Sequence, residues 1–428
     1  MCKGKFHKVL KINNLRAFLS PFLGWRLARS VLLAVLFSLF SLYAIGCGDG
    51  RDRAGSSGKA VATCADSARF DTLDYARMFR LGSQCDTKFV EIRTVLGADT
   101  LVWRQPVGEP FKWVVVLSSA QIGFMSRLGV EDRIVAVGDA KYIVDSAVLA
   151  GVQSGKVAEV GIGPTLSLER VLELKPDLVM TFATGGSHDD YERLKAIGVP
   201  LLVTSEWQED SPLAKFEWIK LFGMLFGVDQ IADTLYRQSK EKYLAFTREF
   251  GLEIASPSAR NDNPSASNDT ASFTSRPRVI VGMAYGGVWH APGGQSYTAQ
   301  LIRDAGGRYL WESDTTREKQ LSLEEVMLLA DSADVWVNPG MFSSVEDILA
   351  AEPRVKDIRA FREKRVCQND GYRGPGGGND FYEGAVARPV ELVENLRDCI
   401  FGGNGGVSGA KSGVGPYKWY RNIYNFPL

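Results

Sequence analysis

The longest helical pattern of apolar and polar residues lies between Ser211 and Gly251. Ser211 is a typical N-cap for a first helix, and apolar residues recur after it at helical spacing. Asp229 can cap a second helix, which carries an apolar stripe as far as Phe250 and stops at Gly251. A helix of about twenty residues is roughly 30 Å long, which is the width of a small domain. The pattern predicts either a rigid rod between two lobes or two ordinary packing helices of one domain.

Short apolar runs that predict buried strands alternate with helical patterns on both sides of this stretch. Two further β-type runs within residues 88–104 predict a hairpin before the main fold. Strands that alternate with helices over short connections argue for parallel α/β sheets. The predicted strands of these sheets are residues 113–117, 133–137, 178–181, 200–203, 278–283 and 334–338.

The size and charge of the chain exclude some classes of protein. It has 428 residues, of which 45% are hydrophobic, and this is enough for two domains with proper cores. Its 50 basic residues balance its 50 acidic residues. Because no net positive field is present to hold phosphate groups, we expect no binding of nucleic acid.

The N-terminus has the pattern of an export signal. A basic leader precedes an apolar run over residues 31–46, and Cys47 follows directly. This run is too short to span a membrane comfortably. The small residues before the cysteine resemble the lipobox of bacterial lipoproteins, in which the cysteine carries lipid. We therefore expect a signal peptide over residues 1–46 and a lipid anchor on Cys47, at the periplasmic face of the inner membrane or at the outer membrane. The alternative is an uncleaved anchor helix, and both interpretations export the domain.

Four further cysteines lie in the exported part, where disulfides persist. They can be joined in three ways, and pairing within each local pair closes the shorter loops. Free buried thiols are the alternative. No Cys/His cluster indicates a structural metal site. The four residues are Cys64, Cys85, Cys367 and Cys399.

Composition shifts along the chain predict its division into segments. A polar tether follows the signal peptide, and a stretch rich in Ser, Asn, Asp and Pro predicts a disordered loop between the two halves. A Gly-rich linker leads to an aromatic tail that we expect to dock on the fold. The segments are signal peptide 1–46, tether 47–68, β extension 69–112, N-terminal α/β lobe 113–210, linking helices 211–251, disordered loop 252–277, C-terminal α/β lobe 278–401, and linker with tail 402–428.

Several motifs agree in order with one known family. The first half contains VVVLSSAQIGFMSRLGVEDRIVAVGD and GPTLSLERVLELKPDLVMT, the centre contains SPLAKFEWIKLFGMLFG, and the second half contains SYTAQLIRDAGGRYLW and LSLEEVMLLADSADVWVNPG. Over residues 113–401 the chain resembles the class III periplasmic binding proteins of iron and vitamin B12 ABC importers. The resemblance implies two α/β lobes with central parallel sheets, joined by one long helix at about residues 229–250. A stiff connecting helix implies that the lobes close only slightly around a ligand in the cleft between them.

The same resemblance implies a function in transport and no enzymatic activity. A monomeric lipoprotein would capture a chelated metal and deliver it to an ABC permease dimer with its ATPase. The ligand would be a ferric siderophore, haem or a corrinoid, and no cofactor of its own is expected. One alternative is a chelatase-like lipoprotein enzyme that handles tetrapyrroles, for which His188 with Glu206 is the one acid–base pair available. The other is a surface-exposed scavenger that works without a permease.

Candidate ligand-binding residues lie in segments that follow predicted strands. In the run YRGPGGGNDFY, over residues 372–382, glycines would let the backbone approach a flat ligand while rings, an arginine and an amide bind it. The mature chain has only His188 and His290, too few for a cage around a bare metal ion, and this favours a pre-chelated metal. His290 would donate one axial bond or serve as an ordinary loop histidine. The candidates are Ser119, Tyr142, Trp207, Tyr285, His290, Tyr297, Tyr372, Arg373, Asn379 and Tyr382.

Two glutamates occupy equivalent places in the two halves. Glu169 lies in LSLERV and Glu324 lies in LSLEEV, each near the start of a predicted short helix. The resemblance implies that each carboxylate meets arginines of the permease when the carrier docks. The alternative is that an acidic residue at a helix start simply complements the helix dipole.

Overall fold

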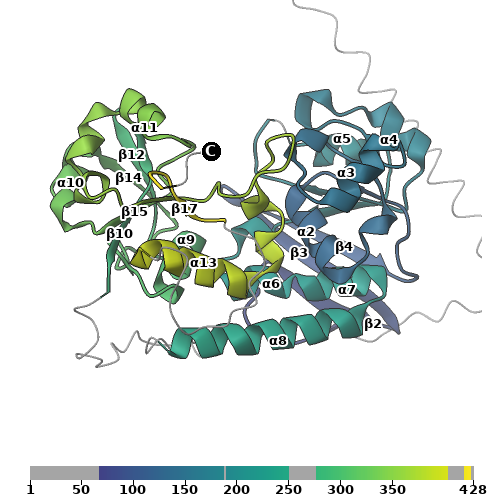
Figure 1. The fold of residues 1–428 in the computed structure, drawn as a ribbon. Helices are drawn as coiled ribbons and strands as arrows, with labels where there is room; N and C mark the ends of the chain where they lie inside the picture. The colour runs from purple at the N-terminus through teal and green to yellow at the C-terminus, as the bar shows by residue number, and fades with distance from the viewer. Residues whose placement is uncertain (1–66, 188, 250–275, 403–418, 426–428) are drawn as a thin grey trace, which may run out of the picture. The chain divides into compact units, whose positions relative to one another are not determined.

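The structure is a computed structural model that describes residues 67–187, 189–249, 276–402 and 419–425 (Figure 1). The predicted signal peptide, Cys47, Cys64 and His188 lie outside these residues, as does most of the predicted loop 252–277. All the described residues belong to one compact unit, Cys64–Leu428. Within them, no helix combines the length and apolar character that a membrane span requires.

An antiparallel sheet of four strands precedes the first lobe, in the order β1-β2-β3-β4. The predicted hairpin is β3 with β4, paired from Lys88 opposite Val107 to Leu96 opposite Asp99. Side chains alternate along β4 between exposed and partly buried, as expected of a strand with one solvated face. The strands are β1 (Arg69–Phe70), β2 (Phe79–Gln84), β3 (Thr87–Leu96) and β4 (Asp99–Val107).

The first lobe is built on a parallel sheet with the strand order β7-β6-β5-β8-β9. Val114, Val115 and Val116 of the central strand are buried, because both faces of a parallel sheet are covered. We call this sheet with its helices the N-terminal lobe. Its strands are β5 (Val114–Val116), β6 (Ile134–Val137), β7 (Ala158–Glu159), β8 (Leu178–Phe182) and β9 (Leu201–Thr204). Its helices are α2 (Ser119–Leu128), α3 (Ser146–Gln153), α4 (Leu168–Leu174) and α5 (Tyr191–Ala196).

The central helical stretch contains three helices rather than the two that the pattern predicts. They are α6 (Pro212–Glu217), α7 (Ile219–Phe226) and α8 (Asp229–Arg248), and α6 and α7 meet at the fully buried Trp218. Figure 1 shows α8 running alongside α6, α7 and α13, in agreement with its packing. Tyr236 of α8 packs into the core of the N-terminal lobe and Tyr243 into the second core. The long helix therefore spans two cores, as the rod interpretation predicts.

The second lobe repeats the parallel arrangement and adds antiparallel strands that the sequence patterns miss. We call it the C-terminal lobe; its main sheet has the order β13-β10-β15-β16-β17, in which β17 alone is antiparallel. A separate antiparallel sheet has the order β11-β12-β14. Its strands are β10 (Arg278–Val281), β11 (Met283–Tyr285), β12 (Val288–Pro292), β13 (Arg308–Tyr309), β14 (Glu318–Ser322), β15 (Val335–Val337), β16 (Val366–Gln368) and β17 (Arg421–Asn422). Its helices are α9 (Tyr297–Asp304), α10 (Leu323–Met327), α11 (Val345–Ala351), α12 (Arg359–Arg362) and α13 (Pro389–Phe401).

Two segment ends differ from the sequence-based division. The predicted loop includes Arg276, but its guanidinium donates to the carbonyl oxygens of Gly306 and Gly307, at 3.2 and 2.6 Å. Arg276 is therefore part of the C-terminal lobe. The aromatic tail is also part of that lobe, because Trp419 is fully buried and β17 extends the sheet. These contacts depend on residues distant in sequence, so no local pattern marks them.

Disulfide-bonded cysteines are present in the C-terminal lobe and in the antiparallel sheet that precedes the N-terminal lobe. Cys367 of β16 is bonded to Cys399 of α13, with 6.1 Å between their Cα atoms. Cys85 is also disulfide-bonded. The architecture as a whole is α/β, with two parallel sheets and one long helix that packs against both cores, and the predicted fold class is confirmed.

Candidate functional site

A cavity of about 480 Å³ lies between the segment that follows β9 and the part of the C-terminal lobe formed by β12, the start of α9 and the start of β14. Three of the sequence-predicted residues line it, namely Trp207, His290 and Tyr297. Arg317 links the two sides, because its guanidinium donates to the Gln208 carbonyl oxygen at 2.8 Å. The remaining lining residues are Glu209, Asp210, Ala291, Pro292, Gln295, Ser296, Thr298 and Glu318. The cavity therefore combines aromatic surface with basic and acidic side chains.

The two rings at the mouth of the cavity are accessible to a ligand. Trp207 lies in a 3₁₀ turn directly after β9 and exposes 43% of its surface. His290 lies in β12, and its Nδ1 is 4.0 Å from the Glu318 carboxylate. An indole face can stack on a flat ligand, and an imidazole can donate a hydrogen bond or coordinate a metal. This side of the cavity can thus hold a planar or metal-containing group.

Ionisable side chains of low exposure lie at the cavity and next to it. The Lys215 ammonium is 4.1 Å from the centre of the Tyr297 ring, and burial lowers the pKa of this lysine. Burial raises the pKa of Glu206, and raises that of Glu209 to about 7. Glu209 accepts hydrogen bonds from the backbone N–H groups of Arg77 and Met78. The turn that carries Trp207 is therefore held by contacts with residues distant in sequence, and not by its own backbone alone.

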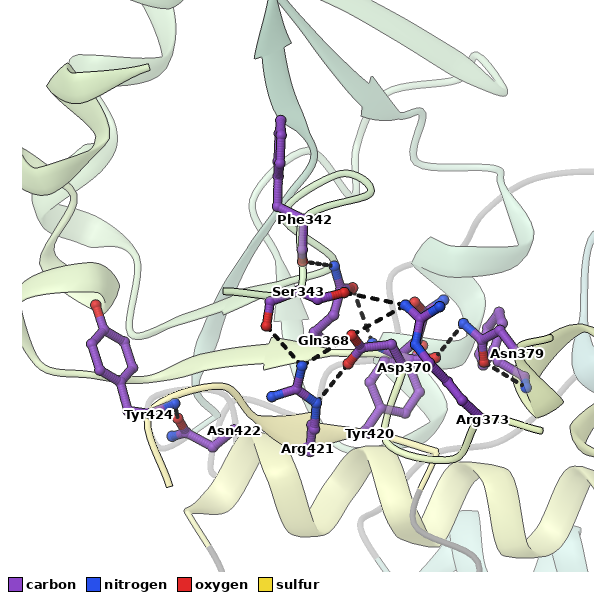
Figure 2. A network of polar contacts seen from close by, with 12 residues as sticks. Phe342, Ser343, Gln368, Asp370, Arg373, Asn379, Tyr420, Arg421, Asn422 and Tyr424 are labelled. Carbon is purple, nitrogen blue, oxygen red and sulfur yellow. Dashed lines mark hydrogen bonds and ion pairs between the residues drawn. The ribbon is translucent and has the colours of Figure 1, made fainter. Parts of the chain in front are cut away.

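A row of rings leads from the cavity along the C-terminal lobe. The Tyr285 ring lies 6.1 Å from that of His290 and 6.0 Å from that of Phe342. The next residue, Ser343, accepts a hydrogen bond from the Arg373 guanidinium at 3.2 Å. Figure 2 shows Phe342, Ser343 and Arg373 in this arrangement. Two predicted site residues, Tyr285 and Arg373, are thus connected to the cavity by contiguous contacts.

The glycine-rich run over residues 372–382 forms a hairpin that packs on the chain itself. The Gly374 N–H donates to the Gly378 carbonyl, and Arg373 and Asn379 form a β-bridge. A Cβ on Gly376 would lie 2.6 Å from the Lys141 Cα, and one on Gly378 would lie 2.3 Å from the Tyr142 carbonyl oxygen. The sequence analysis assigned these glycines to a close approach to a ligand. In this structure they permit a close approach to the backbone of residues 141–144.

The other predicted residues lie at or near this hairpin. Ser119 donates through its hydroxyl to the Tyr382 carbonyl oxygen at 3.4 Å. The Asn379 side chain accepts from the Phe381 N–H and donates to the Asn369 carbonyl, so both ends of its amide are used within the protein. Tyr142 and Tyr382 each expose 50% of their surface, and Tyr372 exposes 38%. The candidates thus form two groups, one at the cavity and one at the hairpin.

The sequence analysis missed Arg317 and Glu318, as well as Gln208 to Asp210. The last three directly follow Trp207, so the rule that sites lie after strands could have included them. Glu318 is the first residue of β14 and Arg317 directly precedes it. No apolar pattern predicts this strand, because its side chains alternate only between exposed and partly buried. Only its pairing with β12 brings this strand to the cavity.

The two predicted docking glutamates occupy matching positions. Ser167 caps α4 and Ser322 caps α10, and in each helix the glutamate is the second residue. Both Glu169 and Glu324 are exposed. Glu324 is 3.0 Å from the Arg354 guanidinium, which is also exposed. Within the described residues, no group of three or more His, Cys, Asp or Glu side chains could hold a metal ion.

Comparison with known proteins finds a family model that matches part of the chain, and distant relatives. Residues 114–250 match the family model described as periplasmic binding protein. An uncharacterized lipoprotein of Methanocaldococcus jannaschii is 20% identical over 279 residues, which are 62% of this chain and 61% of that protein. The chain thus spans less than two thirds of that lipoprotein's length. The vitamin B12-binding protein of Vibrio parahaemolyticus is 21% identical over 251 residues, which are 57% of this chain and 78% of that protein.

Solved structures with similar folds also have low sequence identity to this chain. A periplasmic binding protein from Veillonella parvula has 16% sequence identity and a TM-score of 0.49, and the match covers 73% of this chain and 98% of that one. The family match over residues 114–250 and the ordered sequence motifs in both halves are mutually consistent. Residues 114–250 therefore carry a region similar to the periplasmic binding proteins.

Proposed function

We propose that the chain is the substrate-binding component of an ABC importer and that it holds a chelated metal in the cavity beside Trp207. The observation that carries this proposal is the composition of the cavity, whose walls come from both lobes. Its volume of about 480 Å³ lies in the range typical of pockets for small ligands. A ligand bound there would contact the N-terminal lobe through Trp207 and the C-terminal lobe through His290.

The side chains at the cavity favour a ferric siderophore, haem or a corrinoid as the ligand. The faces of Trp207 and Tyr297 suit a flat or apolar organic framework, while Arg317 and His290 suit anionic oxygens or an exposed metal position. The similarity to a vitamin B12-binding protein supports a ligand of this size and chemistry.

Delivery to a permease would use the exposed glutamates. Glu169 on α4 and Glu324 on α10 present a carboxylate at the start of a helix in each lobe. Arginines on a symmetric permease dimer would meet both carboxylates at once. A lipid on Cys47 would keep the carrier near the permease at the membrane surface, with residues 47–68 as a tether.

Native mass spectrometry tests this function directly. The full exported chain is incubated separately with a ferric hydroxamate, ferric citrate, haemin and cobalamin, and intact complexes are weighed. We expect one chelate to bind at a ratio of one to one and to be recovered unchanged. Failure of all four to bind would contradict the proposal, and so would release or insertion of metal with turnover, which would indicate a chelatase.

A further inference from the structure

Asp370 is a buried carboxylate that contacts two arginines (Figure 2). It lies just after β16 and exposes 2% of its surface. Arg421 of β17 reaches both of its oxygens, with Nε 2.7 Å from Oδ1 and Nη2 3.0 Å from Oδ2. Arg373 reaches Oδ2 alone, at 3.4 Å. Because paired short contacts are the stronger arrangement, Arg421 is the principal counter-ion of this carboxylate.

These three side chains carry one more positive charge than negative charge. The Arg421 side chain is 5% exposed, whereas that of Arg373 is 35% exposed. The Arg373 guanidinium also donates to two uncharged groups, namely the Ser343 hydroxyl at 3.2 Å and the Gly377 carbonyl at 3.3 Å. The excess positive charge therefore lies on Arg373, at the surface and next to the row of rings that leads to the cavity.

The C-terminal tail also holds the hairpin that carries Arg373. The Gly371 N–H donates to the Trp419 carbonyl at 2.9 Å, at the start of the hairpin. The Trp419 indole N–H donates to Asp380 at 2.7 Å, near its end. Trp419 and β17 thus fix both ends of the segment, although they follow it by about forty residues.

We propose that Arg421 is a positioning residue for Arg373, which binds an anionic oxygen of the ligand. Arg421 neutralises Asp370, so the Arg373 guanidinium stays available for a carboxylate or hydroxamate. Without Arg421, the buried carboxylate would lack its counter-ion, a strongly unfavourable state, and would recruit Arg373 instead. This inference rests on the proposed function, because it assigns a ligand contact to the same carrier.

A ligand-free experiment tests the competition for Asp370. Phenylglyoxal modifies arginine side chains, and an arginine held in a close ion pair reacts more slowly. After digestion, mass spectrometry of the peptide that contains Arg373 gives the rate at which phenylglyoxal modifies this residue. We expect this rate to fall several-fold in Arg421→Met and to return to the parent value in Arg421→Met/Asp370→Asn. The matched control is Asn422→Ala, on the same strand, whose side chain donates to the Lys364 carbonyl. Equal rates in all variants would overturn the proposal.

A binding experiment tests the consequence for the ligand, with haemin as the probe because it carries two carboxylates. Arg373→Ala and Arg421→Met should each weaken binding by about tenfold or more. Adding Asp370→Asn to Arg421→Met should restore affinity to within about threefold of the parent. A structural role for Arg421 would predict no rescue, since the double variant has lost both sides of the ion pair. Persistent loss in the double variant would therefore overturn the proposal.

A single variant covers the case in which Arg421→Met does not fold. Asp370→Asn alone removes the competing carboxylate, so the Arg373 reaction rate and the affinity for haemin should equal or exceed those of the parent. A tenfold fall in affinity with this variant would contradict the proposal. If the parent binds no chelate at all, the proposed function fails, while the modification rates still decide whether Arg421 controls Arg373.

Discussion

The Glu383 carboxylate accepts a hydrogen bond from the backbone N–H of Val144 at 3.0 Å, across a sequence separation of 239 residues. Glu383 follows the glycine-rich hairpin, and Val144 lies in the segment of the N-terminal lobe on which that hairpin packs. Burial raises the pKa of Glu383 to about 8. This contact therefore links the two lobes through a group that titrates near neutral pH.

The raised pKa predicts the direction in which stability changes with pH. The folded chain retains the Glu383 proton to a higher pH than the unfolded chain, whose pKa is near 4.5. The stabilising contribution is therefore complete below about pH 4.5 and is lost as the pH rises to about 8. Glu383→Gln should remove this loss and raise the free energy of unfolding at pH 8 by about 1 to 3 kcal/mol.

Urea unfolding at a series of pH values checks this prediction. Glu192→Gln, at an exposed helix position, is the matched control and should follow the parent. Some pH dependence should remain in Glu383→Gln, because Glu209 is also buried and its pKa is raised to about 7. Parallel curves for the parent and Glu383→Gln would show that this carboxyl group does not titrate as described.

Trp207 should contribute stacking energy to ligand binding. Trp207→Ala should weaken the affinity for the chelate identified by mass spectrometry by about ten- to a hundredfold, measured by calorimetry. Trp113→Ala is the control, since Trp113 exposes 59% of its surface and does not line the cavity. Unchanged affinity in Trp207→Ala would contradict binding beside Trp207 and would indicate a ligand site at the hairpin of residues 372–382.

The docking glutamates should affect transport without affecting the ligand. Glu169→Ala with Glu324→Ala should abolish uptake in cells and leave the affinity for the chelate unchanged, because charges at a rim orient docking. Glu173→Ala with Glu346→Ala removes two other exposed carboxylates and should transport normally. Normal uptake by the first double variant would exclude the docking role.

The disulfide between Cys367 and Cys399 should stabilise the C-terminal lobe. It closes a loop with a sequence separation of 32 residues. For a loop of this length, Cys367→Ala/Cys399→Ala should lower the free energy of unfolding by about 4 kcal/mol, measured in urea without reductant. Adding reductant to the parent is a poorer comparison, because Cys85 is disulfide-bonded as well. An unchanged midpoint in the double variant would contradict the prediction.

Most of the segment between α8 and β10 should be replaceable with little loss of stability, provided that Arg276 is kept. A short Gly/Ser linker in place of residues 255–275 should change the free energy of unfolding by about 1 kcal/mol or less, since loop closure depends weakly on length. Extending the replacement through Arg276 should cost more, because it removes donors to the Gly306 and Gly307 carbonyls. Equal stability of the two replacements would show that this arginine is not needed.

Local patterns in the sequence were sufficient for elements whose stability is largely set by neighbouring residues. The long helix α8 follows from its apolar stripe, and the buried strand Val114–Val116 follows from an uninterrupted apolar run. The caps at Ser211, Ser167 and Ser322 are present for the same reason. The predicted cap by Asp229 is wrong, because Val228 is the N-cap residue, without a side-chain hydrogen bond, and Asp229 is the first residue of the helix, where its charge suits the helix dipole. Trp207, His290 and Tyr297 could be nominated because they lie beside such elements.

Contacts between distant residues were decided only by the tertiary structure. Nothing near Gly376 in the sequence indicates that it lies against Lys141, and nothing near Arg421 indicates that it pairs with Asp370. Strand β17 is two residues long, so it has no period to detect, and its place depends on pairing with β16. A residue's type and spacing determine which helix or strand it favours. Its partner across the fold depends on how those elements pack, and that arrangement decides which polar groups remain for a ligand.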